Sequence, residues 1–326
     1  MKISKSEKEW FRQLNGKSRE EAHQPVAEQA AARTAKHVAR VPKGKGLADV
    51  AGMADLKRMV KEGFIDVLQH KDCAAAYGIR PPSMLFYGPA GCGKTYFAEK
   101  VAEEVGIHFM KVVPDDLAST LVHGSQEKIG ELFRKAEKHS PMLLFFDEFD
   151  AMVPARSNDE RNYQNGEVNE FLCMLNNAAD RGIYVLAATN HPERIDKAVL
   201  RTGRIDELIY VGMPDAAARA ELFRLSLSRL PSEEDIDYEQ LARLAEGFNC
   251  SDIDYIVKVA SRKMFNLTIS QEEASYARIS QRVLEEAIAR QSPSVTMRDL
   301  KEYERVRSEL QPKKAGAQRR TIGFHI

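Results

Sequence analysis

Cysteine, tryptophan and long apolar runs are all scarce in this 326-residue chain, which has one tryptophan. Its four cysteines include no C-x-x-C pair, so they suggest neither a disulfide framework nor the ligand spacing of a zinc site. No apolar run approaches the roughly 18 residues of a membrane-spanning helix, and residues 1–5 do not lead into the apolar core of a signal peptide. The sequence therefore predicts a cytoplasmic protein with reduced thiols and no membrane span.

Net charge is absent as well, since 48 lysines and arginines balance 48 acidic residues. This balance does not favour a nucleic-acid partner, which a strong basic excess would indicate. Residues 1–46 are an exception, with eleven basic and five acidic side chains, and they end in the linker-like sequence Pro-Lys-Gly-Lys-Gly. We expect a basic N-terminal arm and linker here. Its Trp10 and Phe11 favour binding of a partner or substrate over packing on the rest of the chain, and disorder is the third alternative.

The chain does contain a glycine-rich loop, residues 88–95, between an apolar segment at 84–87 and a helical pattern. In this setting the loop predicts a P-loop, in which backbone N–H groups and a helix start face the phosphates of a nucleoside triphosphate. Lys94 would reach the β- and γ-phosphates, and the Thr95 hydroxyl would bind Mg²⁺. We interpret Cys92 as a small tolerated residue rather than a redox switch. The expected nucleotide-binding residues here are Gly88, Pro89, Ala90, Gly91, Cys92, Gly93, Lys94, Thr95 and Tyr96.

An acidic pair closes the next apolar run, where Asp147 and Glu148 follow residues 142–146. A continuous apolar run predicts a strand buried on both faces of a parallel sheet, and ligands bind at the carboxyl ends of such strands. We expect Asp147 to hold Mg²⁺ and Glu148 to orient and deprotonate the attacking water. Alone, the pair would be interpreted as a solvated strand end. Together with the P-loop it favours hydrolysis.

A third apolar strand, residues 183–188, leads to Asn190 and then to Arg201 and Arg204 on either side of a glycine. This segment resembles the second region of homology of the AAA ATPase family, which includes katanin, spastin and the proteasomal ATPases. The resemblance covers roughly residues 47–310. It extends to further residues that we expect near the nucleotide: Asp49, Val50, Ala51, Gly52 and, within the stretch 247–253, Ser251.

The resemblance implies roles for Asn190, Arg201 and Arg204. Asn190 looks like sensor 1, which helps to place the water near the γ-phosphate. Arg201 and Arg204 look like arginine fingers that act on the nucleotide of a neighbouring subunit, although each taken singly would be interpreted as a surface ion pair. No arginine stands in the stretch 247–252, as in the katanin and spastin group and unlike clamp loaders.

The predicted fold class is α/β, a P-loop parallel sheet flanked by helices and followed by a small all-helical lid domain. Strands alternate with helical patterns over residues 47–213, while residues 214–310 are helical in pattern throughout. The lid assignment comes from the resemblance. Residues 311–326 are expected to form a C-terminal tail, and the absence of an internal repeat indicates one ATPase module.

The resemblance implies an ATPase that uses ATP and Mg²⁺, assembles as a homohexameric ring and remodels, unfolds or disassembles a protein client. By the resemblance, Leu121 takes the place of the family's aromatic pore residue and His123 that of its glycine. Leu121 and Val122 are therefore expected to make an apolar but smaller contact with a client. The alternative is a nucleic-acid-associated AAA+ motor or loader, against which the charge balance and the missing arginine stand. A nucleotide-gated scaffold without turnover conflicts with the joint presence of Lys94, Asp147, Glu148 and the two finger arginines.

Overall fold

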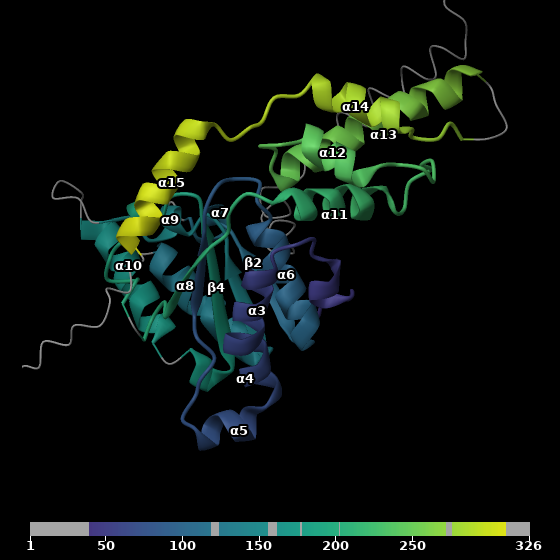
Figure 1. Ribbon diagram of the computed structural model, residues 1–326. Coiled ribbons are helices and arrows are strands. Elements are labelled where there is room, and N and C mark those ends of the chain that lie inside the picture. Colours follow the sequence, from purple (N-terminus) through teal and green to yellow (C-terminus); the bar gives the residue numbers. More distant parts are fainter. Residues whose placement is uncertain are drawn as a thin grey trace, which may run out of the picture. The chain divides into compact units, whose positions relative to one another are not determined.

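The computed structural model describes residues 39–118, 124–155, 162–176, 178–201, 203–271 and 276–310 (Figure 1). Residues 1–38 of the predicted N-terminal arm, including Trp10, lie outside the described residues, as do the predicted client contacts Leu121 and Val122 and the C-terminal tail. The expectations attached to them remain predictions.

Five strands form one sheet: β1 (Met84–Tyr87), β2 (His108–Val112), β3 (Met142–Phe146), β4 (Ile183–Thr189) and β5 (Glu207–Tyr210). Their order is β2-β3-β4-β1-β5, and all neighbouring pairs are parallel. The three central strands are the three continuous apolar runs of the sequence. The edge strands β2 and β5 are only partly buried, which is why their sequences are less uniformly apolar.

Helices connect the strands and cover the sheet. Those before β1 are η2 (Gly46–Asp49), α3 (Ala54–Val60), the π-helical turn η3 (Lys61–Ile65), α4 (Asp66–Gln69) and α5 (Lys71–Ala76). Those between the strands are α6 (Lys94–Val105), α7 (Pro114–Leu117), α8 (Gly124–Lys138), α9 (Phe149–Met152), α10 (Asn162–Leu175), η4 (Ala179–Arg181) and η5 (Pro192–Arg194).

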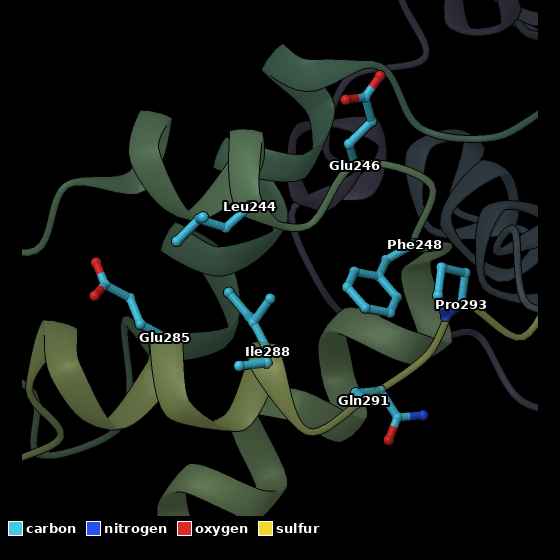
Figure 2. Close-up of a pocket in the computed structure, with 8 residues that line it drawn as sticks. Leu244, Glu246, Phe248, Glu285, Ile288, Gln291 and Pro293 are labelled. Carbon is cyan, nitrogen blue, oxygen red and sulfur yellow. The ribbon is translucent and has the colours of Figure 1, made fainter.

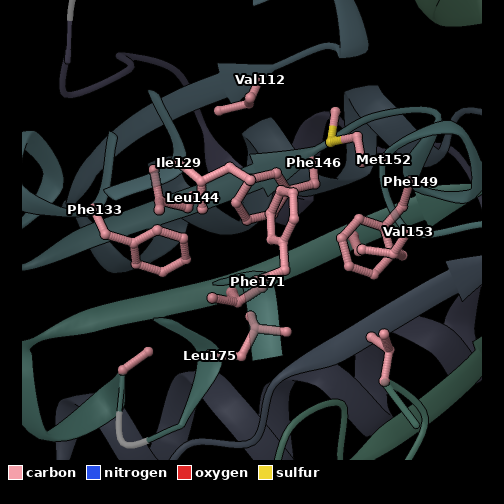
Figure 3. Close-up of a cluster of buried hydrophobic side chains, with 14 of the residues drawn as sticks. Val112, Ile129, Phe133, Leu144, Phe146, Phe149, Met152, Val153, Phe171 and Leu175 are labelled. Carbon is pink, nitrogen blue, oxygen red and sulfur yellow. The ribbon is translucent and has the colours of Figure 1, made fainter. Parts of the chain in front are cut away.

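Alternation along the strands divides the core of the sheet into two layers. Phe146 points toward α8 and α10, where it packs on Phe133 and Phe171 with ring centroids 6.2 and 5.4 Å apart (Figure 3). Phe86 points to the opposite face and packs edge-to-face on Phe97 of α6, at 5.6 Å. Since successive side chains of a strand face opposite sides, the buried strands require apolar residues at every position.

Residues 216–310 form the C-terminal helical region, with helices α11 (Ala216–Leu227), α12 (Tyr238–Leu244), α13 (Cys250–Gln271), α14 (Gln281–Ala289) and α15 (Met297–Leu310). The first four share a hydrophobic core that includes Phe223, Leu241, Ile256 and Leu284. Asp215 caps α11 by accepting a hydrogen bond from the N–H of Ala218. The predicted fold class, a parallel sheet flanked by helices and followed by a helical region, is confirmed.

None of the helices in the described ranges is both long enough and apolar enough to cross a bilayer.

Candidate functional site

The sheet order brings the ends of three strands together. β4 lies between β1 and β3, with Tyr87 paired to Thr189 and Phe146 paired to Ala187. The P-loop after β1, the acidic pair after β3 and Asn190 after β4 therefore lie along one carboxyl edge of the sheet. This is the edge at which open parallel sheets bind their ligands.

The P-loop is folded around the ammonium group of Lys94. Its Nζ donates to the carbonyl oxygens of Gly88 and Pro89, both at 2.8 Å. Lys94 is only 8% exposed, and burial lowers the pKa of its ammonium group from 10.5 to about 8. Two neutral carbonyls therefore hold a buried positive charge, for which an anionic phosphate would be a stronger partner.

Two glycines of this loop lie close against residues of other elements. Gly88 has φ +146°, and a Cβ atom there would collide with the carbonyl oxygen of Val211. Gly91 has φ +73°, and a Cβ atom there would lie 2.5 Å from the side-chain nitrogen of Asn249. An L side chain would be both strained and crowded at either position. Only glycine therefore fits at these two positions of the loop.

The two residues predicted to hold Mg²⁺ contact each other. Thr95 Oγ1 donates to Asp147 Oδ2 at 3.0 Å, although the two residues are 52 positions apart. The N–H of Asp147 donates to the carbonyl of Val112 at 2.9 Å, so the ladder between β2 and β3 continues past the end of β3. Asp147 Oδ1 accepts from the N–H of Glu148 at 3.1 Å.

Glu148 has a left-handed backbone conformation, with φ +53° and ψ +45°, immediately before α9. A non-glycine residue in this region is uncommon and costs on the order of 1 kcal/mol or more. Such conformations gather at functional sites, where the surrounding structure holds them. Here the turn ends the strand and leaves the Glu148 side chain exposed beside Asp147.

Asn190, at the end of β4, is held through its main chain. Its carbonyl accepts a hydrogen bond from the hydroxyl of Tyr303 in α15 at 2.8 Å. The preceding Thr189 donates its hydroxyl to the carboxylate of Asp150 and accepts from the N–H of His191. No pattern in the sequence pointed to Tyr303, because 113 residues separate it from Asn190.

Asn249 joins the C-terminal helical region to the P-loop. It is 2% exposed, and its Nδ2 donates to the carbonyl of Ala90 at 3.0 Å and to Ser294 Oγ at 2.9 Å. The backbone N–H of Ser251 donates to the carbonyl of Gly91 at 3.1 Å. Two successive carbonyls of the loop are therefore bonded to the helical region.

The segment 49–52 lies against α6 and α11. The Asp49 carboxylate accepts from Lys100 Nζ, and the Asp49 carbonyl accepts from the Tyr96 hydroxyl, each at 3.1 Å. The N–H of Gly52 donates to the carboxylate of Glu221 at 2.6 Å, and the two residues between Asp49 and Gly52 are buried. Asp49 thus contacts α6, which begins at the P-loop, while Gly52 contacts α11.

The two predicted arginine fingers follow η5. Arg204 Nη1 donates to the carbonyl of Ala198 at 2.7 Å, while Arg201 is exposed. The action of both residues on a neighbouring subunit stays a prediction.

The donor set fits a Mg²⁺ ion that is bound together with nucleotide. Mg²⁺ in such sites takes one or two protein oxygens and completes its shell with waters and phosphates. The hydroxyl of Thr95 and the carboxylate of Asp147 supply such a pair. Within the described ranges, no group of three or more His, Cys, Asp or Glu forms an all-protein metal site.

A separate cavity of about 320 Å³ lies in the C-terminal helical region (Figure 2). Leu244, Phe248 and Ile288 contribute to its apolar lining, together with the acidic residues Glu246 and Glu285. None of the predicted nucleotide-binding residues lines it, so it is distinct from the strand-end site.

Comparison with known proteins agrees with the geometry. Residues 84–213 match the family model described as "ATPase family associated with various cellular activities (AAA)". This chain contains an AAA ATPase domain. The matched residues include β1, the P-loop, the acidic pair, Asn190 and both arginines, and an AAA ATPase domain implies ATP hydrolysis.

Two relatives extend the similarity beyond the residues that match the family model. The chain is 33% identical over 269 residues to the Cell division cycle protein 48 homolog of Archaeoglobus fulgidus, covering 79% of this chain and 37% of the relative. It is 32% identical over 267 residues to Protein mac-1 of Caenorhabditis elegans, covering 79% of this chain and 33% of that protein. The chain thus spans about a third of the length of these relatives.

The AAA domain also contains a charged residue that the sequence patterns did not single out. Lys111 of β2 places its Nζ 2.6 Å from Asp147 Oδ2. Its contact depends on the pairing of β2 with β3, and β2 had not been identified from the sequence.

The lowered pKa of Lys94 predicts that ATP binding depends on pH. Above about pH 8 the free protein holds Lys94 neutral, whereas bound phosphates favour the charged form, so binding must take up a proton. The dissociation constant of ATP should rise toward about tenfold per pH unit between roughly pH 8 and 10. Calorimetry in two buffers of different ionisation enthalpy should show uptake of about one proton at pH 9 and almost none at pH 7.

Nearby thiols do not interfere with this measurement, because burial raises the pKa of Cys92 to about 12 and that of Cys250 to about 11. Lys94→Arg is the matched control, since a guanidinium group remains charged across the whole range. An ATP affinity of the unsubstituted protein that does not change from pH 7 to 9.5 would contradict the interpretation.

Proposed function

We propose that this chain is a Mg²⁺-dependent ATPase that assembles as a homohexameric ring and remodels a protein partner. The observation that supports hydrolysis most strongly is the hydrogen bond of 3.0 Å between Thr95 and Asp147, beside the buried ammonium group of Lys94. It joins the P-loop helix to the end of β3, so that phosphate-binding and metal-binding groups share one edge of the sheet. The family resemblance supports the ring and the protein partner.

In this proposal each residue of the site has a definite task. The backbone N–H groups of the P-loop bind the phosphates of ATP, and Lys94 exchanges its two carbonyl partners for the β- and γ-phosphates. Mg²⁺ held by Thr95 and Asp147 would neutralise phosphate charge. Asn190 and Glu148 orient a water molecule for attack on the γ-phosphate, and the Glu148 carboxylate accepts the proton of that water. The products are ADP and phosphate.

Arg201 and Arg204 would act on the nucleotide of the neighbouring subunit, so the proposed site is complete only in a ring. A guanidinium group from the neighbouring subunit would stabilise the negative charge on the γ-phosphate in the transition state. The residues of one subunit alone would neutralise that charge only in part. The exposure of Arg201 is compatible with such a role. The bond from Arg204 to Ala198 would hold the second arginine in place on its own subunit.

In this proposal the C-terminal helical region acts as a lid that moves when nucleotide binds or leaves. Asn249 and Ser251 bond to consecutive P-loop carbonyls, so a change in the loop on binding or release of phosphate alters the contacts of the lid. Movement of the lid would then act on the client. The proposed client contacts Leu121 and Val122 lie outside the described residues.

The client class can be tested by measuring ATP turnover in the presence of defined polymers. We expect a permanently unfolded protein, such as reduced and carboxymethylated lactalbumin, to stimulate phosphate release several-fold. Double- and single-stranded DNA should have little effect at 50 or 200 mM salt. Stimulation by DNA that falls steeply with salt would instead support the nucleic-acid motor or loader, because phosphate contacts release counter-ions.

A further inference from the structure

The register of the sheet places Lys111 beside Asp147. Lys111 is paired with Phe145, and Phe109, on the same face of β2, stacks on Phe145 with ring centroids 6.1 Å apart. Because side chains alternate along a strand, Phe145 and Asp147 share this face with Phe109 and Lys111. The backbone bond from Asp147 to Val112 extends the ladder far enough to keep the aspartate in register.

Lys111 and Thr95 bind the same carboxylate oxygen. Lys111 Nζ lies 2.6 Å from Asp147 Oδ2, and Thr95 Oγ1 donates to that oxygen from 3.0 Å. The side chain of Asp147 is 21% exposed and that of Lys111 is 42% exposed, so the lysine reaches from the solvent into the site. Lys94 does not make this contact, since its ammonium group is bonded to the P-loop carbonyls.

We propose that Lys111 is a displaceable counter-ion of Asp147 that competes with the divalent cation for this carboxylate. The proposal rests on the proposed role of Asp147 in binding Mg²⁺. An ammonium group and a divalent cation both need Oδ2, and each repels the other at this distance. Lys111 therefore neutralises Asp147 when no nucleotide is bound and weakens binding of the bare cation. The triphosphate, which brings negative charge with it, overcomes this competition.

Displacement of Lys111 requires little structural change. The lysine is on an edge strand and its side chain is partly exposed, so its ammonium group can return to water without leaving a buried charge behind. Thr95 and Asp147 are then both free to bind the cation. Lys111 acts as a positioning residue that sets when the site accepts a metal.

The test uses Mn²⁺ as the probe and electron paramagnetic resonance to count free and bound ion in the nucleotide-free full chain. Lys111→Met should bind Mn²⁺ roughly two- to fivefold more tightly than the unsubstituted protein, a range typical of removing one partly exposed ion-pair partner. Lys111→Arg keeps the charge and should remain close to the unsubstituted protein. Lys258→Met removes a lysine from an ion pair of the same 2.6 Å length, formed with Asp254 on α13, and should leave Mn²⁺ affinity unchanged.

Asp147→Asn separates the metal-binding role of Asp147 from the counter-ion role of Lys111. If Asp147→Asn weakens Mn²⁺ binding while Lys111→Met leaves it unchanged, the counter-ion role of Lys111 is overturned and the metal role of Asp147 stands. If Asp147→Asn does not weaken Mn²⁺ binding, both roles are overturned. Competition is supported if Lys111→Met binds Mn²⁺ more tightly and Lys111→Arg binds it with the affinity of the unsubstituted protein. A loss of folding would not produce this result, because an unfolded variant would bind Mn²⁺ less tightly.

Discussion

Replacement of Glu148 by glutamine should reduce ATP turnover by about 10²–10⁴-fold while leaving ATP binding intact. The substitution removes the carboxylate that accepts the proton of the attacking water. It leaves Lys94, Thr95 and Asp147 in place, together with the hydrogen bond that joins the last two. Turnover is measured as phosphate release at saturating Mg²⁺ and ATP, and affinity as the dissociation constant of ATP for each protein.

Glu193→Gln is the matched control for this experiment. Glu193 is a half-exposed glutamate of η5 that pairs with Arg194 and contacts His191, so its substitution changes the charge equally and removes none of the groups assigned to ATP, Mg²⁺ or the attacking water. This control should turn over ATP at the unsubstituted rate. Near-normal turnover in Glu148→Gln would show that Glu148 does not accept the proton of the attacking water.

Replacement of Arg204 by alanine should reduce turnover by about 10³–10⁵-fold, the range expected for loss of an arginine finger. Each Arg204→Ala subunit should still bind ATP, because its own P-loop and acidic pair are unchanged. Mixing Arg204→Ala with Glu148→Gln should restore part of the activity. In a mixed ring some sites combine the carboxylate of one variant with the intact arginine of the other.

Arg194→Ala provides the control, since Arg194 is an exposed arginine of η5, close in sequence to the proposed fingers. It should leave turnover unchanged and should not complement Glu148→Gln. Sedimentation should show growth of the particle when ATP is added to Glu148→Gln. If the unsubstituted protein hydrolyses ATP at full rate as a dilute monomer, Arg204 does not act in trans.

Patterns that are contiguous in the chain could be predicted from the sequence. The P-loop lies within residues 88–95, and the acidic pair follows its strand directly, so spacing and strand ends were sufficient to identify them. The strand order was not predictable in the same way. Apolar runs identify the buried strands but do not predict that β4 lies between β1 and β3. That order places Asn190 near both the P-loop and the acidic pair.

Contacts between distant elements explain the residues that the sequence patterns missed. The ion pair of Lys111 with Asp147 requires the register of β2 on β3, and Asn249 meets Ala90 across 159 positions. Helix α15 lies within residues 214–310, which were predicted to be helical, but its contact with Asn190 was not anticipated. It is rich in charge and Val306 is its one buried residue, so it has no apolar stripe of the width that indicates a packed helix.

The most direct test of the account is phosphate release by the purified full chain with Mg²⁺ and ATP, compared with Lys94→Ala. Lys94 is the buried cation around which the P-loop is folded, so its removal should weaken ATP binding and abolish release at ATP concentrations that saturate the unsubstituted protein. The account predicts saturable release by the unsubstituted chain that Lys94→Ala lacks. Equal release by the two proteins, or none from the unsubstituted chain at any protein concentration, would contradict it.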